Sequence, residues 1–296
     1  MPKVTVIIPT YNWSSVLPYS IGSVLRQTFT DFELLVVGDG CTDDSEAVVG
    51  AIPDPRVRWI NLPTNAGNQC YANNEGWRQA KGRMIAYVNH DDLWLPHHLG
   101  LAVAAIDAGA DLTYALTEMI EPQNPQPTFE PSEMEHYQLD QWISPTSVVH
   151  RREAGEKAGP WRHFLEVNVD PEADLWGRMH RVGCRFQFIR RLTAVKFPAV
   201  WRRDVYKLRP CHEQAAWTRR IQSEPDFEAV ELARMLTPLF PDARAARPFR
   251  EVLTEFGQDV VARIRRRLIG FGLLRPQSRR AFYMARRRFK GLQNKV

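Results

Sequence analysis

The stretch MIAYVNHDDLW, residues 84–94, begins with apolar residues and ends in two adjacent carboxylates, Asp91 and Asp92, followed by Leu93 and Trp94. A short apolar run bounded by polar residues is typical of a buried β-strand. Asp and Asn at a strand end most commonly begin a turn. Two like charges side by side repel each other, however, unless water or a cation offsets the repulsion. We therefore expect a buried strand whose end is a candidate cation site.

Similar apolar runs occur on both sides of this stretch. Five runs between residues 4 and 117 read as strands: VTVIIP, FELLVVGD, VRWINL, MIAYVN and LTYALT. Segments with helical patterning lie between them, over residues 19–26, 44–52, 71–80 and 97–108. Continuously apolar strands that alternate with helices are typical of a mostly parallel sheet covered on both faces. The sequence therefore predicts an α/β fold.

The second half of the chain is less regular. A segment rich in Pro and acids, residues 121–136, is predicted to be a long loop that acts as a flap. After it we expect a strand over 143–152, a helix that begins near Asp174 and stops at Gly183, and two strands, CRFQFI and LTAVKFP. From residue 214 onward the pattern changes to helices and loops.

The composition excludes several classes of protein. With 44% hydrophobic and 25% charged residues, the 296-residue chain is not expected to be disordered. It contains no apolar stretch near the roughly 20 residues of a transmembrane helix, and the apolar part of the N-terminus is too short for a signal peptide. The four cysteines are far apart and form no CxxC pair, so neither a zinc site nor a disulfide framework is expected. These features predict a reducing, cytoplasmic location.

The net charge of +5 is unevenly distributed. Residues 258–296 contain twelve Arg and Lys against one acid, Asp259, so this basic tail carries +11 and the remaining residues about −6. Apolar residues alternate with the basic ones, which suits a helix lying on an anionic membrane surface. A helix packed on the body with an exposed basic face is an equal alternative. We expect no nucleic-acid partner, because the body is acidic.

Polar residues follow two of the predicted strands. Asp39 ends one, and Asn89, Asp91 and Asp92 follow the other. In open α/β sheets, ligands bind beyond the carboxyl ends of the strands. Mg²⁺ is bound by one or two carboxylates together with substrate phosphates, and Mn²⁺ accepts similar oxygen ligands. The usual glycine-rich phosphate motifs are missing, which favours a nucleoside diphosphate neutralised mainly by a metal.

Two long stretches resemble a known family. They are VTVIIPTYNWSSVLPYSIGSVLRQTFTDFELLVVGDGCTDDS, residues 4–45, and NLPTNAGNQCYANNEGWRQAKGRMIAYVNHDDLW, residues 61–94. The VIIPTYN strand, the VGDGCTDDS turn, the NAGNQCYANNEG helix start and the acidic turn follow one another as in the N-terminal half of family 2 glycosyltransferases. The resemblance implies a GT-A fold, a nucleotide-sugar donor and a divalent metal, Mn²⁺ or Mg²⁺.

The resemblance also implies roles for individual residues. The residues implied to contact the donor nucleotide are Pro9, Thr10, Tyr11, Asn12, Asp39 and Asn74, of which Asp39 accepts a hydrogen bond from the base. In the acidic turn, the resemblance implies that Asp92 is the direct metal ligand and that Asp91, near the ribose or donor sugar, also belongs to the metal site. Family members often carry Asp at the position of Asn89 and Arg at that of Asn73. Both departures bear on donor preference.

A general base is needed to deprotonate the acceptor hydroxyl in an inverting transfer. The segment DPEADLW, residues 170–176, resembles a family helix start in which the second of two acids is the base. This alignment puts Glu172 at the base position and Pro171 where relatives carry an acid, with Asp170 as the second candidate. Without the resemblance, acids at this position would be assigned to the helix dipole.

Further candidates surround this segment. Hydroxyl groups that are candidates to bind a sugar, or simply to line a strand edge, belong to Ser144, Thr146 and Ser147. Tryptophans that are candidates for sugar stacking, though packing is the commoner role, are Trp142, Trp161 and Trp176. His212 is the best-placed histidine for a metal, and His90 is interpreted as a spacer.

Together these features predict a GT-A catalytic domain over 1–212, with a nucleotide-binding half over about 1–120 and an acceptor half over 121–212, and a helical extension over 213–296. The predicted activity is a metal-dependent, inverting transfer from a UDP-sugar to a saccharide or lipid-linked acceptor, in polysaccharide or glycolipid synthesis. The predicted location is the cytoplasm, with a peripheral position at the inner face of the membrane as the alternative. The alternatives are a catalytically silent nucleotide-binding assembly protein and a nucleotidyltransferase.

Overall fold

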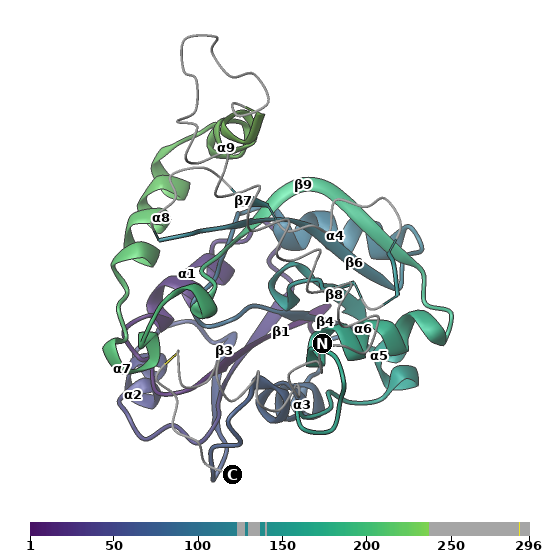
Figure 1. The fold of residues 1–296 in the computed structure, drawn as a ribbon, viewed down its shortest axis with the longest axis horizontal. Helices are drawn as coiled ribbons and strands as arrows, with labels where there is room; N and C mark the ends of the chain where they lie inside the picture. Colours follow the sequence, from purple (N-terminus) through teal and green to yellow (C-terminus); the bar gives the residue numbers. More distant parts are fainter. Residues whose placement is uncertain (123–127, 130–136, 140, 237–289, 291–296) are drawn as a thin grey trace, which may run out of the picture.

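The computed structural model describes residues 1–122, 128–129, 137–139, 141–236 and 290 (Figure 1). Most of the predicted flap and all of the basic tail except Lys290 lie outside these residues, so both stay predictions. The described residues form one sheet with helices packed against both of its faces.

The first half of the sheet is parallel. Its strands are, in spatial order, β3 (Val57–Asn61), β2 (Phe32–Gly38), β1 (Val4–Thr10) and β4 (Met84–Tyr87). All three pairings between them are parallel. Every residue of β1, β2 and β4 is buried, as expected for strands covered on both faces. The buried strand predicted in MIAYVN is confirmed as β4.

The second half of the sheet is mixed. β8 (Val149–Arg151) is antiparallel to both β4 and β6 (Leu112–Met119). β9 (Phe186–Lys196) runs parallel to β6, and the short β5 (Leu93–Trp94) and β7 (Thr128–Phe129) add antiparallel pairs. The sheet therefore changes direction at β4, next to the acidic turn.

β9 corrects one prediction. The runs CRFQFI and LTAVKFP were expected to be two strands, yet they form a single strand. Its register against β6 shifts between Ile189 and Leu192, which leaves Arg190 and Arg191 as an exposed irregularity. A bulge of this kind absorbs extra residues without ending the strand, so the polar pair did not mark a turn.

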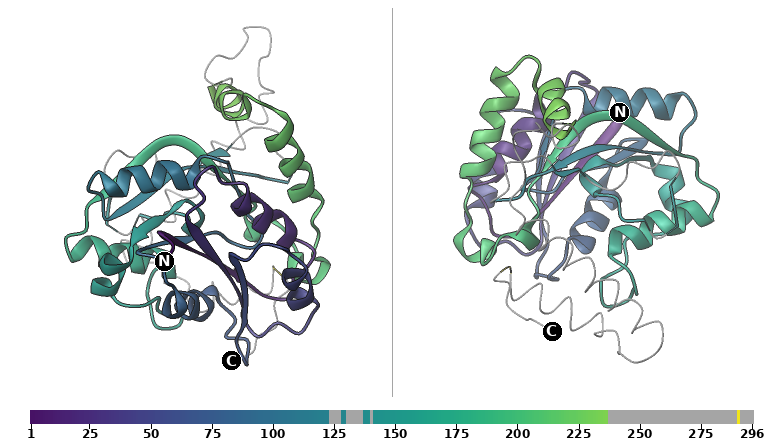
Figure 2. Two further views of the ribbon diagram at one scale, coloured as in Figure 1. Left: turned by 180° about the vertical axis from the view of Figure 1, so that it is seen from behind. Right: turned by 45° about the horizontal axis from the view of Figure 1, so that its top comes forward.

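Four helices of the first half agree with the prediction to within a few residues: α1 (Leu17–Leu25), α2 (Ser45–Gly50), α3 (Gln69–Gln79) and α4 (His98–Asp107). α1 and α4 pack on one face of the sheet and α3 on the other (Figures 1 and 2). Successive strand residues point to opposite faces. In β1, accordingly, Ile8 packs in the α1 and α4 cluster and Ile7 in the α3 cluster.

α5 (Arg152–Ala158) and α6 (Pro171–Arg181) lie on the same face as α3. α6 begins three residues earlier than predicted, because Pro171 suits the first helical position, where its fixed φ fits and its missing N–H is not needed. Gly183 follows the helix with a φ of 83°, a left-handed conformation that ends helices at glycine. The predicted stop is therefore confirmed.

The strand predicted over 143–152 is mostly not a strand. It contains a 3₁₀ turn, η1 (Pro145–Ser147), and only its end forms β8. Proline has no N–H to donate to a ladder, so Pro145 interrupts the pairing.

After β9 the chain is helical as far as residue 236, as predicted. It forms η2 (Ala199–Trp201), α7 (Val205–Leu208), α8 (His212–Ser223) and α9 (Phe227–Leu236). An apolar cluster that includes Phe227 and Trp217 joins α8 and α9 to β5 and β9. Among the described residues, the helices are all too short or too polar to cross a membrane.

Candidate active site

A pocket of about 450 Å³ lies beyond the carboxyl ends of β1, β2 and β4, where a ligand site was expected. The predicted site residues that line it are Pro9, Thr10, Tyr11, Asp39, Asp91, Asp170 and Glu172. The predicted site residues that are not part of its lining are Asn12, Asn74 and Asp92. The structure thus brings the donor-side acids and the candidate bases into one cavity.

The turn after β1 is held by Asn12, which has a φ of 45°. Asn tolerates this left-handed conformation better than most residues. Its side-chain Oδ1 accepts hydrogen bonds from the backbone N–H groups of Thr42, at 2.7 Å, and Asp43, at 3.2 Å. Asn12 therefore ties the β1 turn to the turn after β2. The adjacent Thr10 lines the pocket with a buried hydroxyl that has no partner among the described residues.

Asp39 organises the loop that follows β3. Its carboxylate accepts hydrogen bonds from Asn65 Nδ2 and the Ala66 N–H, both at 2.9 Å, and from the Gly67 N–H at 3.1 Å. The side chain is 4% exposed and also lines the pocket. Asp39 thus shapes this wall of the cavity, in addition to its predicted hydrogen bond with the base of the nucleotide.

Asn74 lies on α3 and contacts another segment instead of the pocket. Its Nδ2 donates to the carbonyl of Trp161, and its Oδ1 accepts from the N–H of the same residue, both at 2.9 Å. Both polar groups of the amide are therefore used to fix residue 161 against α3.

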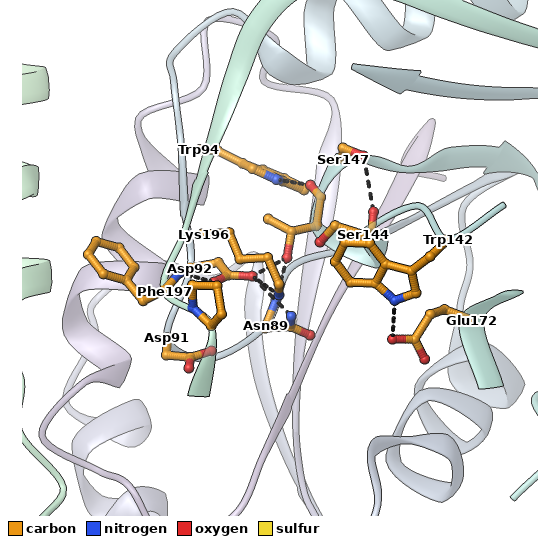
Figure 3. Close-up of polar contacts among 12 residues, drawn as sticks. Asn89, Asp91, Asp92, Trp94, Trp142, Ser144, Ser147, Glu172, Lys196 and Phe197 are labelled. Atoms are coloured by element: carbon orange, nitrogen blue, oxygen red, sulfur yellow. Dashed lines mark hydrogen bonds and ion pairs between the residues drawn. The ribbon is translucent and has the colours of Figure 1, made fainter. Parts of the chain in front are cut away.

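The two adjacent carboxylates, Asp91 and Asp92, differ in their hydrogen bonding to the protein (Figure 3). Asp92 is completely buried. Its oxygens accept hydrogen bonds from Asn89 Nδ2 at 3.0 Å, Thr146 Oγ1 at 2.5 Å, Lys196 Nζ at 3.1 Å and the Phe197 N–H at 3.0 Å. These protein donors occupy the carboxylate that was predicted to bind the metal directly.

Asp91 faces the pocket and lies outside that network (Figure 3). It is 6% exposed. Burial, and next the charge of Asp92, raise the pKa of its carboxyl. A carboxylate in this situation gains most from a cation. The geometry therefore favours Asp91 over Asp92 as the carboxylate available to a metal.

The departure at Asn89 fits this arrangement. Its amide donates to Asp92, whereas an Asp at this position would place another carboxylate against a buried one. His90 is more than a spacer, since it is buried and packs edge-on against Trp13 and Tyr206, with ring centroids 5.2 and 5.9 Å away. Burial lowers the pKa of His90.

The acids of α6 divide into two kinds. Glu172 and Asp170 line the pocket, whereas Asp174 forms an ion pair with Arg178 at 2.9 Å. Glu172 Oε1 accepts a hydrogen bond from Trp142 Nε1 at 3.0 Å (Figure 3). Burial, and next the charge of Asp170, raise the pKa of Glu172. A carboxylate whose pKa is raised toward neutrality is a better general base.

Two lysines in the pocket wall were not predicted as site residues. Lys196, at the end of β9, reaches the pocket while its ammonium pairs with Asp92. Lys290 comes from the basic tail, and its carbonyl accepts a hydrogen bond from the Tyr206 N–H at 3.0 Å. A lone Lys in a strand or a basic tail carries no sequence signal for a pocket, so only the folded chain reveals them.

The other candidates are mostly structural. Ser144, Thr146 and Ser147 are at most 1% exposed and are not part of the pocket lining. The tryptophans that pack in the α3 cluster are Trp161 and Trp176, so Trp142 is the one of the three that lines the pocket. His212 begins α8 and is likewise absent from the lining.

The fit of the pocket to a divalent metal depends on the carboxylates that line it. No group of three or more His, Cys, Asp or Glu side chains suited to a metal occurs in the part of the chain that the structure describes. Two buried carboxylates line the cavity. Asp39 already accepts three hydrogen bonds from the loop after β3, so Asp91 is the one more available to a metal. Mg²⁺ commonly takes one or two carboxylates and completes its shell with water and substrate phosphates. The pocket therefore fits a metal that arrives with a phosphorylated substrate.

Comparison with solved structures supports the predicted GT-A fold. Over 82% of its length the chain superimposes on 74% of S. aureus TarS 1–349 in complex with UDP-GlcNAc, with a TM-score of 0.57 and 19% identity. It also superimposes over 88% of its length on 81% of the mannosyltransferase PcManGT from Pyrobaculum calidifontis, solved with GDP-Man and Mn²⁺, with a TM-score of 0.55 and 18% identity. The predicted GT-A fold is confirmed.

Sequence relatives match mainly the first half of the chain. The E. coli protein WfgD, a UDP-Glc:α-D-GlcNAc-diphosphoundecaprenol β-1,3-glucosyltransferase, is 35% identical over 34% of this chain and 40% of its own length. The chain spans only 30–40% of the length of the first four curated relatives that it matches. The family model for glycosyl transferase family 2 matches residues 5–153, half of the chain. The chain therefore belongs to glycosyl transferase family 2.

Proposed function

We propose that this protein transfers a sugar from a nucleoside-diphosphate sugar, UDP-linked in the first instance, to an acceptor hydroxyl with inversion and with a divalent cation. One observation carries the proposal. Asp91 and Glu172 line the same pocket. Asp91 is a buried carboxylate that lies outside the hydrogen-bond network of Asp92, and burial raises the pKa of both Asp91 and Glu172. The first suits a metal and diphosphate, and the second suits a proton acceptor.

On the donor side, Asp91 would hold Mn²⁺ or Mg²⁺ together with the diphosphate. When bound, the metal would offset the negative charge that develops on the leaving nucleoside diphosphate. Lys196 and Lys290 line the same pocket and would add positive charge near the phosphates. This division of work replaces the predicted one, because Asp92 is already satisfied by four protein donors.

On the acceptor side, Glu172 would accept the proton of the attacking hydroxyl. The hydroxyl oxygen forms a bond to the anomeric carbon while the bond from that carbon to the diphosphate oxygen breaks. A single displacement of this kind inverts the anomeric configuration. Asp170 lines the pocket beside Glu172 and remains the second candidate for the base.

The donor proposal is supported by relatives. WfgD is named for UDP-Glc, TarS was solved with UDP-GlcNAc, and PcManGT with GDP-Man and Mn²⁺. The acceptor is proposed to be a saccharide or a lipid-linked saccharide, since the name of WfgD includes a diphosphoundecaprenol acceptor. We also propose the catalytic domain over 1–212 and the helical extension over 213–296, with the chain in the cytoplasm and its basic tail at the inner membrane face.

The test is a donor screen. The purified chain is incubated with UDP-Glc, UDP-GlcNAc and GDP-Man, with Mn²⁺ or with EDTA, and the released nucleotides are measured. We expect release of a nucleoside diphosphate from at least one donor with Mn²⁺, and its loss with EDTA or in Asp91→Asn. Binding of UDP without release from any donor would indicate a catalytically silent protein, and release of pyrophosphate from nucleoside triphosphate and sugar phosphate would indicate a nucleotidyltransferase.

A further inference from the structure

Glu172 is held by a residue from a distant part of the chain. Trp142 lies 30 positions earlier, in the segment before η1, and its indole Nε1 donates to Glu172 Oε1 at 3.0 Å (Figure 3). Both side chains line the pocket. Trp142 is partly exposed, unlike Trp161 and Trp176, which pack in the core. Its polar edge is therefore turned toward an acid of the site.

The position of Glu172 explains why such a contact matters. It is the second residue of α6, directly after Pro171. Pro171 offers no N–H to the carboxylate of Glu172. The resemblance puts an acid at the position of Pro171 in relatives. The first turn of a helix favours the ionised carboxylate, and the backbone N–H of Glu172 is one donor to it. Trp142 supplies a second donor from outside the helix, and the two donors together restrict the direction of the carboxylate.

The hydrogen bond also acts on the charge of Glu172. Burial and the neighbouring Asp170 raise the pKa of Glu172, whereas its own backbone N–H, the hydrogen bond from Trp142 and the charge of Lys196 lower it. A hydrogen bond to the charged form favours that form. Without the indole N–H, a larger fraction of Glu172 would be protonated, and unable to accept a proton, at a given pH.

We propose that Trp142 is a positioning residue for the transfer, whose indole N–H holds the Glu172 carboxylate toward the acceptor hydroxyl and keeps it in its basic form. The inference rests on the proposed role of Glu172 as the base. It differs from a role in stacking on a sugar, because stacking uses the face of the ring and this role uses its N–H.

The experiment separates the N–H from the ring. Trp142→Phe keeps an aromatic face and removes the donor, and Trp142→His restores a ring N–H. We expect the acid limb of the kcat profile in Trp142→Phe to move up by about one pH unit, with a roughly tenfold loss of kcat at pH values below the limb. The loss should diminish at higher pH, and Trp142→His should recover part of it. UDP binding with Mn²⁺ should be unchanged in both variants.

Trp161→Phe is the matched control. It removes another indole donor, which bonds the Tyr87 hydroxyl at 3.2 Å outside the pocket lining. We expect it to lower the melting temperature and to leave the acid limb in place. An acid limb in Trp142→Phe that coincides with the wild type would overturn the inference, as would an equal displacement in Trp161→Phe. If Trp142→Phe unfolds, the pH profile of Trp142→His decides. Its weaker donor should move the acid limb up by less than one pH unit, and a limb at the wild-type position would overturn the inference.

A further variant distinguishes this inference from the proposed function. If Glu172→Gln abolishes transfer while Trp142→Phe keeps the wild-type profile, only the role of Trp142 is wrong. If Glu172→Gln is fully active, the base assignment itself is wrong and the role of Trp142 falls with it.

Discussion

The donor side and the acceptor side of the pocket are built in different ways. On the donor side, buried polar residues hold the backbone of the loops after the strands, as Asn12 holds residues 42 and 43 and Asp39 holds residues 66 and 67. On the acceptor side, Glu172 stands at a helix start, and its side chain accepts one described hydrogen bond from another residue, Trp142. The first side is a scaffold of many bonds, and the second depends on few.

This difference shows which acids are available for chemistry. Asp92 is fully engaged by protein donors, so it stabilises the fold of the acidic turn. Asp91 and Glu172 are incompletely compensated, and burial raises the pKa of each. Perturbed carboxylates that face a cavity are typical of functional sites. Substitutions should therefore separate stability from activity within one pocket.

The largest effect is expected for Glu172→Gln. General-base catalysis contributes roughly 10²- to 10⁴-fold to a rate, so kcat should fall within that range. The amide can still accept the hydrogen bond from Trp142, so the fold and UDP binding should be retained. The measurement is the steady-state rate of transfer together with the Kd for UDP in the presence of Mn²⁺.

Asp170→Asn is the control for this prediction, because Asp170 lines the same pocket wall. It removes a charge that raises the pKa of Glu172, and should change kcat much less than Glu172→Gln does. A severe loss in Asp170→Asn with a mild one in Glu172→Gln would move the base to Asp170.

The second effect contrasts the adjacent acids. Asp92→Asn should lower the free energy of unfolding by about 3 kcal/mol, because it breaks the buried ion pair between Asp92 and Lys196. Asp91→Asn should leave stability unchanged or raise it, since it removes the repulsion between the two carboxylates, but should abolish the Mn²⁺-dependent part of UDP binding. Urea denaturation and calorimetric titration measure the two quantities.

The pair of variants is its own control, because each changes one carboxylate to an amide of the same size one residue apart. The contrast breaks down if Asp92→Asn is stable and has lost Mn²⁺-dependent binding, with Asp91→Asn normal in binding. That result would return the metal to Asp92, as the resemblance implied.

Much of the fold could be predicted because the first half of the chain is periodic. Its strands are continuously apolar and each is separated from the next by a helix, so their type and order followed from local pattern. The second half depends on tertiary contacts. The two runs of β9 are joined across a bulge at Arg190 and Arg191, and Pro145 replaces the expected strand with a turn. The bulge is not decided by residues near it in sequence, whereas Pro145 is a local signal against a strand that the apolar pattern of residues 143–152 outweighed in the prediction.

The site was predicted in part for the same reason. Strand ends identify Asp39 and Asp91, since the topology brings them to one edge of the sheet. The roles within the acidic turn were not predictable, because they depend on donors more than 50 and more than 100 residues away, Thr146 and Lys196. The hydrogen bond from Trp142 to Glu172 likewise joins segments whose spacing carries no signal.

A smaller effect is expected at the edge of the donor side, where Lys290 reaches the pocket. Lys290→Gln should weaken UDP binding by roughly two- to fivefold, which is the range of an exposed charge interaction. Lys295→Gln, in the same basic tail, is the control and should bind UDP as the wild type does. Equal weakening in both variants would indicate a general effect of the tail charge instead of a contact in the pocket.

The last prediction tests the contrast between satisfied and unsatisfied carboxylates away from the pocket. Glu118 on β6 and Glu231 on α9 are both at most 1% exposed. Glu231 forms ion pairs with Arg220 and Arg234, as Asp92 does with Lys196. Burial, and next the charge of Glu231, raise the pKa of Glu118 to about 8. Glu118 is thus the unsatisfied member of the pair.

Because the pKa of Glu118 is higher in the folded chain than its ordinary value of 4.5, the folded state binds its proton more tightly than the unfolded state does. Its contribution to stability is complete below about pH 4.5 and is lost as the pH rises through about 8. We expect the melting temperature to fall further across this window in the wild type than in Glu118→Gln. The variant keeps a hydrogen-bond donor for Glu231 and cannot ionise, so an identical fall in both proteins would place the unsatisfied charge elsewhere.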